Sequence, residues 1–127
     1  MTNGRVKGAN FEREIAKMIH ETLGFDAKRN LEQYREADHG DLNGVPGWLI
    51  ECKRYAHGIT YKQEWWQQCE SAANTRGEQP VLIYKYDRHP IQCVIRLSSI
   101  NPNFASKDGL CEMDFETWAM IVRESLS

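Results

Sequence analysis

Three residues of chemically reactive type lie close together in the middle of the sequence. Asp41 is followed ten residues later by Glu51, and Lys53 comes two residues after Glu51. Side chains two positions apart on a β-strand point to the same face, so Glu51 and Lys53 project together if this segment is a strand. A tight turn between the two segments brings Asp41 beside them. The spacing therefore predicts one patch that holds two carboxylates and one ammonium group.

Such a patch has the chemistry needed to hydrolyse a phosphodiester. Hard divalent cations such as Mg²⁺ bind carboxylate oxygens and keep several waters. A cation held there polarises a phosphodiester and lowers the pKa of a water molecule. A lysine beside it can hold that water or stabilise the charge that builds on the phosphate. For Glu51 or Lys53 taken alone, a cross-strand ion pair is the simpler interpretation.

Glu12 offers a third carboxylate from another part of the chain. It lies at the edge of the apolar stripe formed by Phe11, Ile15, Ile19 and Leu23, where an acid is unexpected. If that stripe packs on the sheet, Glu12 reaches the same patch. The alternative is that Glu12 only complements the dipole of the first helical turn. The sequence leaves both interpretations open.

The elements that must position these residues follow from hydrophobic periodicity and turn residues. Helices are expected at 10–23, with Asn10 as N-cap and Gly24 as the stop, at 61–76, and at 114–126 as a closing helix. Strands are expected at 25–29, 41–45, 48–54, 80–86 and 91–97. Residues 1–8 are expected to form a loose N-terminal arm and 98–110 a loop. This order predicts a single domain over 1–127, an α/β fold with helices on both faces of a mixed five-stranded sheet.

Composition limits the partners and the compartment. The 16 Lys+Arg and 18 Asp+Glu give a net charge of −2, which argues against a protein that simply coats nucleic acid but not against an enzyme with acids at a metal site. No apolar run approaches the ~20 residues that cross a bilayer, and no signal-peptide core is present. The four cysteines contain no CxxC pair. We therefore expect free thiols, no membrane partner and a cytoplasmic location, that of the host if the protein is virus-encoded.

The order of these motifs resembles that of a known superfamily. Glu12 on a helix, Asp41 in "GDL" and Glu51 with Lys53 in "ECK" at a strand end resemble the PD-(D/E)XK nucleases. The segments "KGANFERE", "RNLEQYREADHGDL" and "IECKR" are similar to archaeal-type and phage Holliday junction resolvases, over roughly residues 7–97. The resemblance implies a restriction-endonuclease-like α/β/α sandwich around a central mixed five-stranded sheet. It implies Mg²⁺, with Mn²⁺ able to substitute, held by Asp41, Glu51 and the Cys52 backbone carbonyl and completed by Glu12. Lys53 is then the catalytic lysine.

The resemblance also implies contacts with the substrate. Arg13 and Arg29 match positions that touch DNA phosphates. Further basic residues near the acids add to a predicted DNA-binding set, which comprises Lys7, Arg13, Arg29, Arg35 and Arg54. Gln67 or Gln68 could support the site from the second helix, as a glutamine does in some relatives. Of the neighbouring Trp65 and Trp66, one is expected in the core, and the other in a dimer interface or stacked on a splayed base.

The resulting hypothesis is a magnesium-dependent Holliday junction resolvase that acts on branched double-stranded DNA as a homodimer, because two symmetric nicks need two active sites. One departure is the loop before Asp41, where archaeal resolvases usually carry a serine and this chain has none. A flap, nick or duplex endonuclease or exonuclease of the same fold is therefore an alternative. A non-catalytic DNA-binding module is another, although a binder gains nothing from acids clustered beside phosphate. A zinc-dependent regulator lacks ligand spacing.

Overall fold

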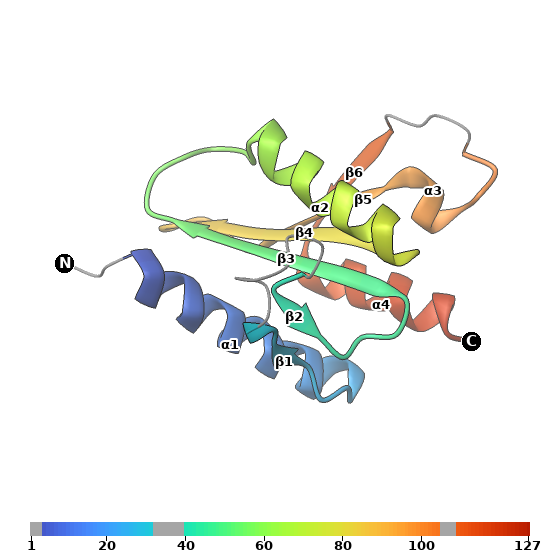
Figure 1. The fold of residues 1–127 in the computed structure, drawn as a ribbon, viewed down its shortest axis with the longest axis horizontal. Coiled ribbons are helices and arrows are strands. Elements are labelled where there is room, and N and C mark those ends of the chain that lie inside the picture. Colours follow the sequence, from blue (N-terminus) through green and yellow to red (C-terminus); the bar gives the residue numbers. More distant parts are fainter. Residues whose placement is uncertain (1–3, 32–39, 105–108) are drawn as a thin grey trace.

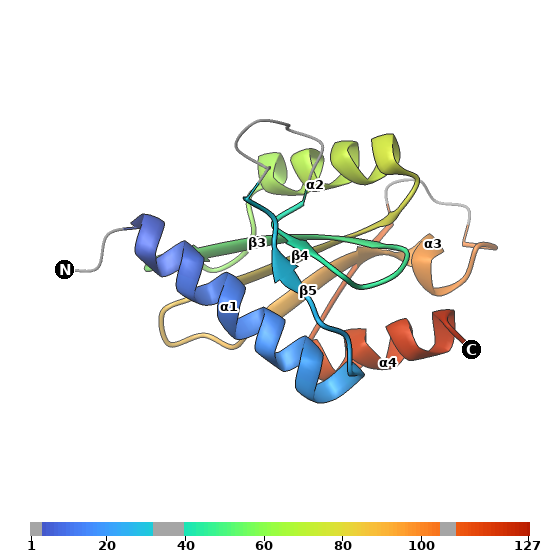
Figure 2. The same ribbon diagram turned by 60° about the horizontal axis from the view of Figure 1, so that its bottom comes forward.

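The computed structural model describes residues 4–31, 40–104 and 109–127 and has three layers (Figure 1). Helices α1 (Gly4–Leu23) and α4 (Phe115–Ser125) cover one face of a central sheet, and α2 (Gln63–Arg76) covers the other (Figure 2). A short helix, α3 (Leu97–Ile100), follows the fifth strand. The predicted α/β/α sandwich is confirmed.

The sheet has six strands that lie side by side in chain order. They are β1 (Lys28–Arg29), β2 (Leu42–Asn43), β3 (Trp48–Tyr55), β4 (Gln79–Tyr86), β5 (Gln92–Arg96) and β6 (Leu110–Met113). β3 and β4 pair in parallel, and every other pair is antiparallel. Two adjacent parallel strands need a crossover connection, which α2 provides. The sheet is therefore mixed, as predicted.

The predicted strand count was wrong by one, because the supposed loop at 98–110 contains α3 and the first residue of β6. β6 is a four-residue edge strand without a fully buried side chain, so it lacks the alternation that marks a strand in sequence. Its strand geometry comes from pairing with β5, where Cys93 lies opposite Met113. The predicted strands at 25–29 and 41–45 also shrink to the two-residue β1 and β2.

The first helix begins earlier than predicted. α1 starts at Gly4, so residues 4–8 are helical rather than a loose arm, and Asn10 lies inside the helix instead of capping it. Asn10 Oδ1 accepts a hydrogen bond from Arg13 Nη1 at 3.1 Å. Lys7 Nζ lies 3.1 Å from Asp87 Oδ1, across 80 residues of sequence. This long-range ion pair fastens the first turns of α1 to the sheet, and nothing in the local sequence signals it.

Two apolar cores lie on either side of the sheet. On one side Phe11, Ile15 and Ile19 of α1 pack against β3 and α4. On the other side α2 packs its apolar stripe on β3, β4 and β5. Trp65 and Trp66 are both buried in this second core, which excludes the predicted alternatives in which one of them is an interface residue or a direct stacking partner for a base.

The four cysteines are free thiols, as predicted. Within the described ranges, no helix combines the length and the apolar character that crossing a bilayer requires.

Candidate active site

Asp41 is tied to the sheet by its backbone and by its side chain. Its N–H donates to the Ile50 carbonyl at 2.7 Å, and its carbonyl accepts from the Asn30 N–H at 2.9 Å. Its carboxylate Oδ2 accepts a hydrogen bond from the Cys52 N–H at 2.6 Å. The turn between β2 and β3 thus places Asp41 beside the middle of β3, as the spacing predicted.

Glu51 and Lys53 lie on the same face of β3. In the parallel ladder with β4, Glu51 is opposite Leu82 and Lys53 is opposite Tyr84, both of which belong to the core under α2. The Glu51 carboxyl is hydrogen-bonded to the Asp41 carboxyl, and the Lys53 ammonium acts on both acids. The structure therefore brings together the three residues from which the sequence argument started.

Glu12 joins them from α1. Its Oε1 accepts a hydrogen bond from Arg29 Nε at 2.8 Å, and its charge is felt by both Asp41 and Glu51. The three acids are nearly inaccessible to solvent, with exposed fractions of 8% for Glu12, 7% for Asp41 and 3% for Glu51. A solvated residue that only complements a helix dipole would not be buried in this way.

Burial dominates the electrostatics of this acidic cluster, which we define as Glu12, Asp41 and Glu51. Desolvation, followed by the charge of Asp41, raises the pKa of Glu51 to about 9, and Lys53 offsets only part of this. Desolvation also raises the pKa values of Glu12 and Asp41. Arg29 and Lys53 therefore do not supply enough positive charge for all three acids to ionise. A divalent cation would complete the balance.

The donor set fits Mg²⁺. Among residues 4–31, 40–104 and 109–127, no three acidic, histidine or cysteine side chains converge to form a complete metal site. Mg²⁺ does not need one, because it usually keeps several waters and binds through one or two carboxylates together with substrate phosphates. Asp41 and Glu51, which already share a hydrogen bond, can supply that pair. A metal that demands a full set of protein ligands fits less well.

Without divalent cations, the free energy of unfolding is expected to fall as pH rises from about 5 to 9. Below about pH 4.5 Glu51 is protonated in both states, whereas above it the unfolded chain releases a proton that the folded protein holds until about pH 9. Asp87 and Asp114, whose pKa values are lowered, titrate below this window. Urea unfolding in EDTA at several pH values measures the trend. A Glu51→Gln variant should show a flatter profile, and an equally steep one would contradict the assignment to Glu51.

Gly40, directly before Asp41, leaves no room for a side chain. A Cβ there would lie 2.7 Å from the Ile50 carbonyl oxygen and 3.0 Å from Leu49 Cγ. Gly40→Ala is expected to push Asp41 off β3 and to lower stability by about 1–3 kcal/mol. Gly8→Ala on α1 meets nothing within 4 Å and should be neutral or stabilising by up to about 1 kcal/mol. Urea unfolding midpoints compare the two, and equal midpoints would refute the close-approach argument.

The predicted DNA-binding residues that the structure describes come from three different elements, α1, β1 and β3. Arg29 pairs with Glu12 inside the acidic cluster, whereas Arg13 is exposed on α1. Arg54 Nη1 lies 2.7 Å from Asp87 Oδ1, so Arg54 and Lys7 meet at the same carboxylate. Arg35 lies outside the described residues. The predicted supports Gln67 and Gln68 are exposed on α2.

Sequence reasoning missed two residues near the site. Asp87 joins Lys7 to Arg54, and the two ion pairs lower its pKa, but it looked like an ordinary turn residue. Gly40 was treated only as part of the "GDL" motif. The sequence did contain a signal, because a glycine directly before an acidic residue is typical of a position where another part of the backbone approaches closely.

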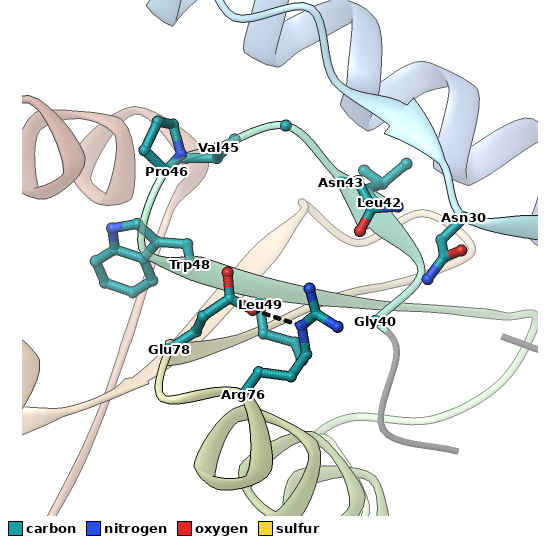
Figure 3. A pocket seen from close by; sticks show the side chains of 11 residues that line it. Asn30, Gly40, Leu42, Asn43, Val45, Pro46, Trp48, Leu49, Arg76 and Glu78 are labelled. Carbon is teal, nitrogen blue, oxygen red and sulfur yellow. Dashed lines mark hydrogen bonds and ion pairs between the residues drawn. The ribbon is translucent and has the colours of Figure 1, made fainter. Parts of the chain in front are cut away.

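A cavity of about 500 Å³ lies near the start of β3, where Trp48 and Leu49 line it (Figure 3). Trp48, Val45 and Pro46 line one side of it, and Arg76 and Glu78, joined by an ion pair of 2.9 Å, line another. None of the three acids of the cluster lines it.

Comparisons with known proteins agree with this geometry. No curated protein sequence matches the chain significantly. Among solved structures, the Holliday junction resolvase Hjc from the hyperthermophilic archaeon Archaeoglobus fulgidus is similar, with a TM-score of 0.57, 15% sequence identity, and coverage of 91% of this chain and 98% of that chain. At this identity the likeness establishes the fold. The family model described as "Phage putative PDDEXK endonuclease" matches residues 3–117. The chain therefore belongs to the phage PDDEXK endonuclease family and is a nuclease of the restriction-endonuclease-like fold.

Proposed function

We propose that the protein is a magnesium-dependent, structure-selective DNA endonuclease, and specifically a Holliday junction resolvase that acts as a homodimer. The observation that carries the proposal is the hydrogen-bonded pair of Asp41 and Glu51 beside Lys53, with Glu12 near enough for its charge to act on both acids. Burying three acids this closely costs stability. Binding of a metal ion and a phosphate substrate explains why the protein keeps buried acids at this place, whereas structural packing alone does not.

In this proposal Asp41, Glu51 and the Cys52 backbone carbonyl hold Mg²⁺, and Glu12 completes the acidic set. Mn²⁺ is expected to substitute. The bound cation would polarise the phosphodiester and lower the pKa of a water. Lys53 positions the attacking water and stabilises the charge that develops on the phosphate. Arg29, which donates to Glu12 Oε1, fixes the orientation of that carboxylate.

Basic residues around the cluster support DNA as the substrate. Lys7 of α1 and Arg54 near the end of β3 converge on Asp87, so the same carboxylate holds both cations in place. Fixed guanidinium and ammonium groups suit phosphate contacts, which position a duplex without reading its sequence. Together with Arg13 and Arg35 they form the proposed contact set. A virus-encoded nuclease of this kind would act in the host cytoplasm.

A second copy of the chain is the proposed partner, because a four-way junction is resolved by two symmetric cuts. A groove of about 610 Å³ between α3 and α4 has the exposed apolar side chains Ile100 and Met120 in its lining, and an exposed apolar patch suits an interface. Sedimentation analysis tests this directly. A protein that stays monomeric at micromolar concentration, with and without a junction, would exclude the dimer.

A cleavage panel tests the substrate assignment. Four-way junctions, flaps, nicked duplexes and continuous duplexes are compared with Mg²⁺, with Mn²⁺ and with EDTA. The resolvase proposal expects paired cuts in the junction, much faster than in continuous duplex, and none in EDTA. Equal rates on junction and duplex would replace it with a general duplex nuclease. Absence of cleavage on every substrate would favour a binding module of the same fold.

A further inference from the structure

A half-exposed aromatic ring continues the row formed by Glu51 and Lys53. Tyr55 is the next residue on the same face of β3, since alternate residues of a strand share a face. Its ring stacks on Trp65 of α2, with centroids 5.1 Å apart and an interplanar angle of 9°. Trp65 is buried, whereas Tyr55 is 47% exposed. Part of a flat aromatic surface therefore faces solvent at the end of the row that carries Lys53.

A group of aromatic side chains holds this ring in place. Trp65 contacts Tyr84 and Tyr86, with ring centroids 6.4 and 6.2 Å apart, and Tyr84 and Tyr86 contact each other at 5.8 Å. Both tyrosines come from β4 and are buried. A side chain that is already fixed loses little conformational entropy when a ligand packs on it.

The loop 56–62, directly after Tyr55, displays an apolar side chain. Ile59 is 89% exposed. The loop is nevertheless anchored, because Tyr86 Oη donates a hydrogen bond to the Thr60 carbonyl at 2.7 Å and Gly58 lies too close to the Tyr86 ring to accept a Cβ. Ile59 thus stands at the tip of a loop that the same aromatic group holds.

We propose that Tyr55 and Ile59 form a subsite for an unpaired or unstacked DNA base next to the cleaved phosphate. The subsite deepens the proposed nuclease function and rests on it. Every base has a π-face that can stack on an aromatic ring, and apolar side chains such as isoleucine act as wedges between base steps. Tyr55 lies about 7 Å along the strand from Lys53, a distance that a base flanking the phosphate at Lys53 can span when it is unstacked.

This subsite selects among DNA structures. A continuous duplex keeps its base faces stacked on one another, whereas a branch point, nick or flap offers a face at little unstacking cost. Two lysines near the subsite can complement the negative charge of the DNA backbone. Lys53 shares the face of β3 with Tyr55, and Lys62 Nζ lies 5.8 Å from the Trp65 ring centroid. The subsite thus gives a physical basis for preferring interrupted DNA.

Binding and crosslinking of the full chain in EDTA test the subsite without cleavage. Fluorescence anisotropy is measured with a four-way junction, a flap and a continuous duplex. Tyr55→Ala should weaken binding of the junction and the flap about tenfold and leave the duplex unchanged, whereas Tyr55→Phe keeps the parent affinities. Ile59→Ser, at a position that is 89% exposed, should weaken the binding of branched DNA severalfold without affecting folding. 5-Iodouracil at the branch point should crosslink to Tyr55, and in continuous duplex it should not.

The opposite results are equally clear. Parent-like affinity of Tyr55→Ala and Ile59→Ser for branched DNA would overturn the subsite, as would equal losses on branched and continuous DNA. If Tyr55→Ala does not fold, Ile59→Ser and the crosslink decide. The proposed function fails separately, through absence of magnesium-dependent cleavage by the parent protein, since neither binding in EDTA nor crosslinking needs catalysis.

Discussion

Lys53→Met is expected to reduce magnesium-dependent DNA cleavage by about a thousandfold or more, while the protein stays folded. Methionine keeps most of the side-chain volume and removes the ammonium group. In the proposed mechanism that group orients the water and stabilises charge on the phosphate. Removing one group that stabilises such charge typically costs a factor of about 10²–10³, and losing the orientation of the water adds to it.

The matched control is Lys85→Met on the neighbouring strand. Lys85 lies one position beyond Tyr84, the residue opposite Lys53, so it points to the other face of the sheet. It makes a hydrogen bond to the Tyr86 carbonyl at 3.4 Å and none to the acidic cluster. Single-turnover cleavage of a four-way junction compares both variants with the parent. Retained activity in Lys53→Met, or an equal loss in both variants, would remove Lys53 from the mechanism.

The parts of the fold that the sequence predicted well have a local signal. The apolar stripe of α2 repeats at the helical period because one face of that helix is buried. The apolar run that opens β3 reflects burial on both faces of the sheet. The predicted end of the helix at residue 76 agrees with the structure, where Gly77, with a positive φ of 67°, forms the C-cap of α2. Gly44 and Gly47, both with positive φ, form the turn between β2 and β3. Because this turn is short, the spacing in the sequence was enough to predict that Asp41 lies beside Glu51.

The parts that the sequence did not predict depend on contacts between distant segments. β6 becomes a strand through its partner β5. The first turns of α1 are fastened by Asp87, which lies 80 residues after Lys7 in the sequence. The same holds in the site, where Arg29, a predicted phosphate contact, also pairs with Glu12. A cation near acids in sequence has no local signal that distinguishes substrate binding from internal pairing, because only the folded chain sets the distance between them.

Glu51→Gln is expected to make the protein more stable without metal and to abolish its response to Mg²⁺. At pH 8 the folded parent must keep a proton on Glu51 that the unfolded chain has released, because burial and Asp41 raise the pKa of Glu51 to about 9. Glutamine is neutral and can still donate to Asp41, so it avoids this cost, which is on the order of 2 kcal/mol or more. Thermal unfolding in EDTA should shift upward by several degrees.

Magnesium should stabilise the parent protein and leave the stability of Glu51→Gln nearly unchanged. A ligand that binds only the folded state stabilises it in proportion to the logarithm of its concentration. The parent therefore gains stability as Mg²⁺ is added, and Glu51→Gln, which lacks one of the two proposed carboxylate ligands, gains little. Glu14→Gln removes an exposed acid from α1 and should behave like the parent. If Glu51→Gln is less stable than the parent in EDTA and still responds to Mg²⁺, then Glu51 serves the fold and not the metal. If it is more stable and unresponsive, the acidic cluster is a place where the protein gives up stability in order to bind a cation.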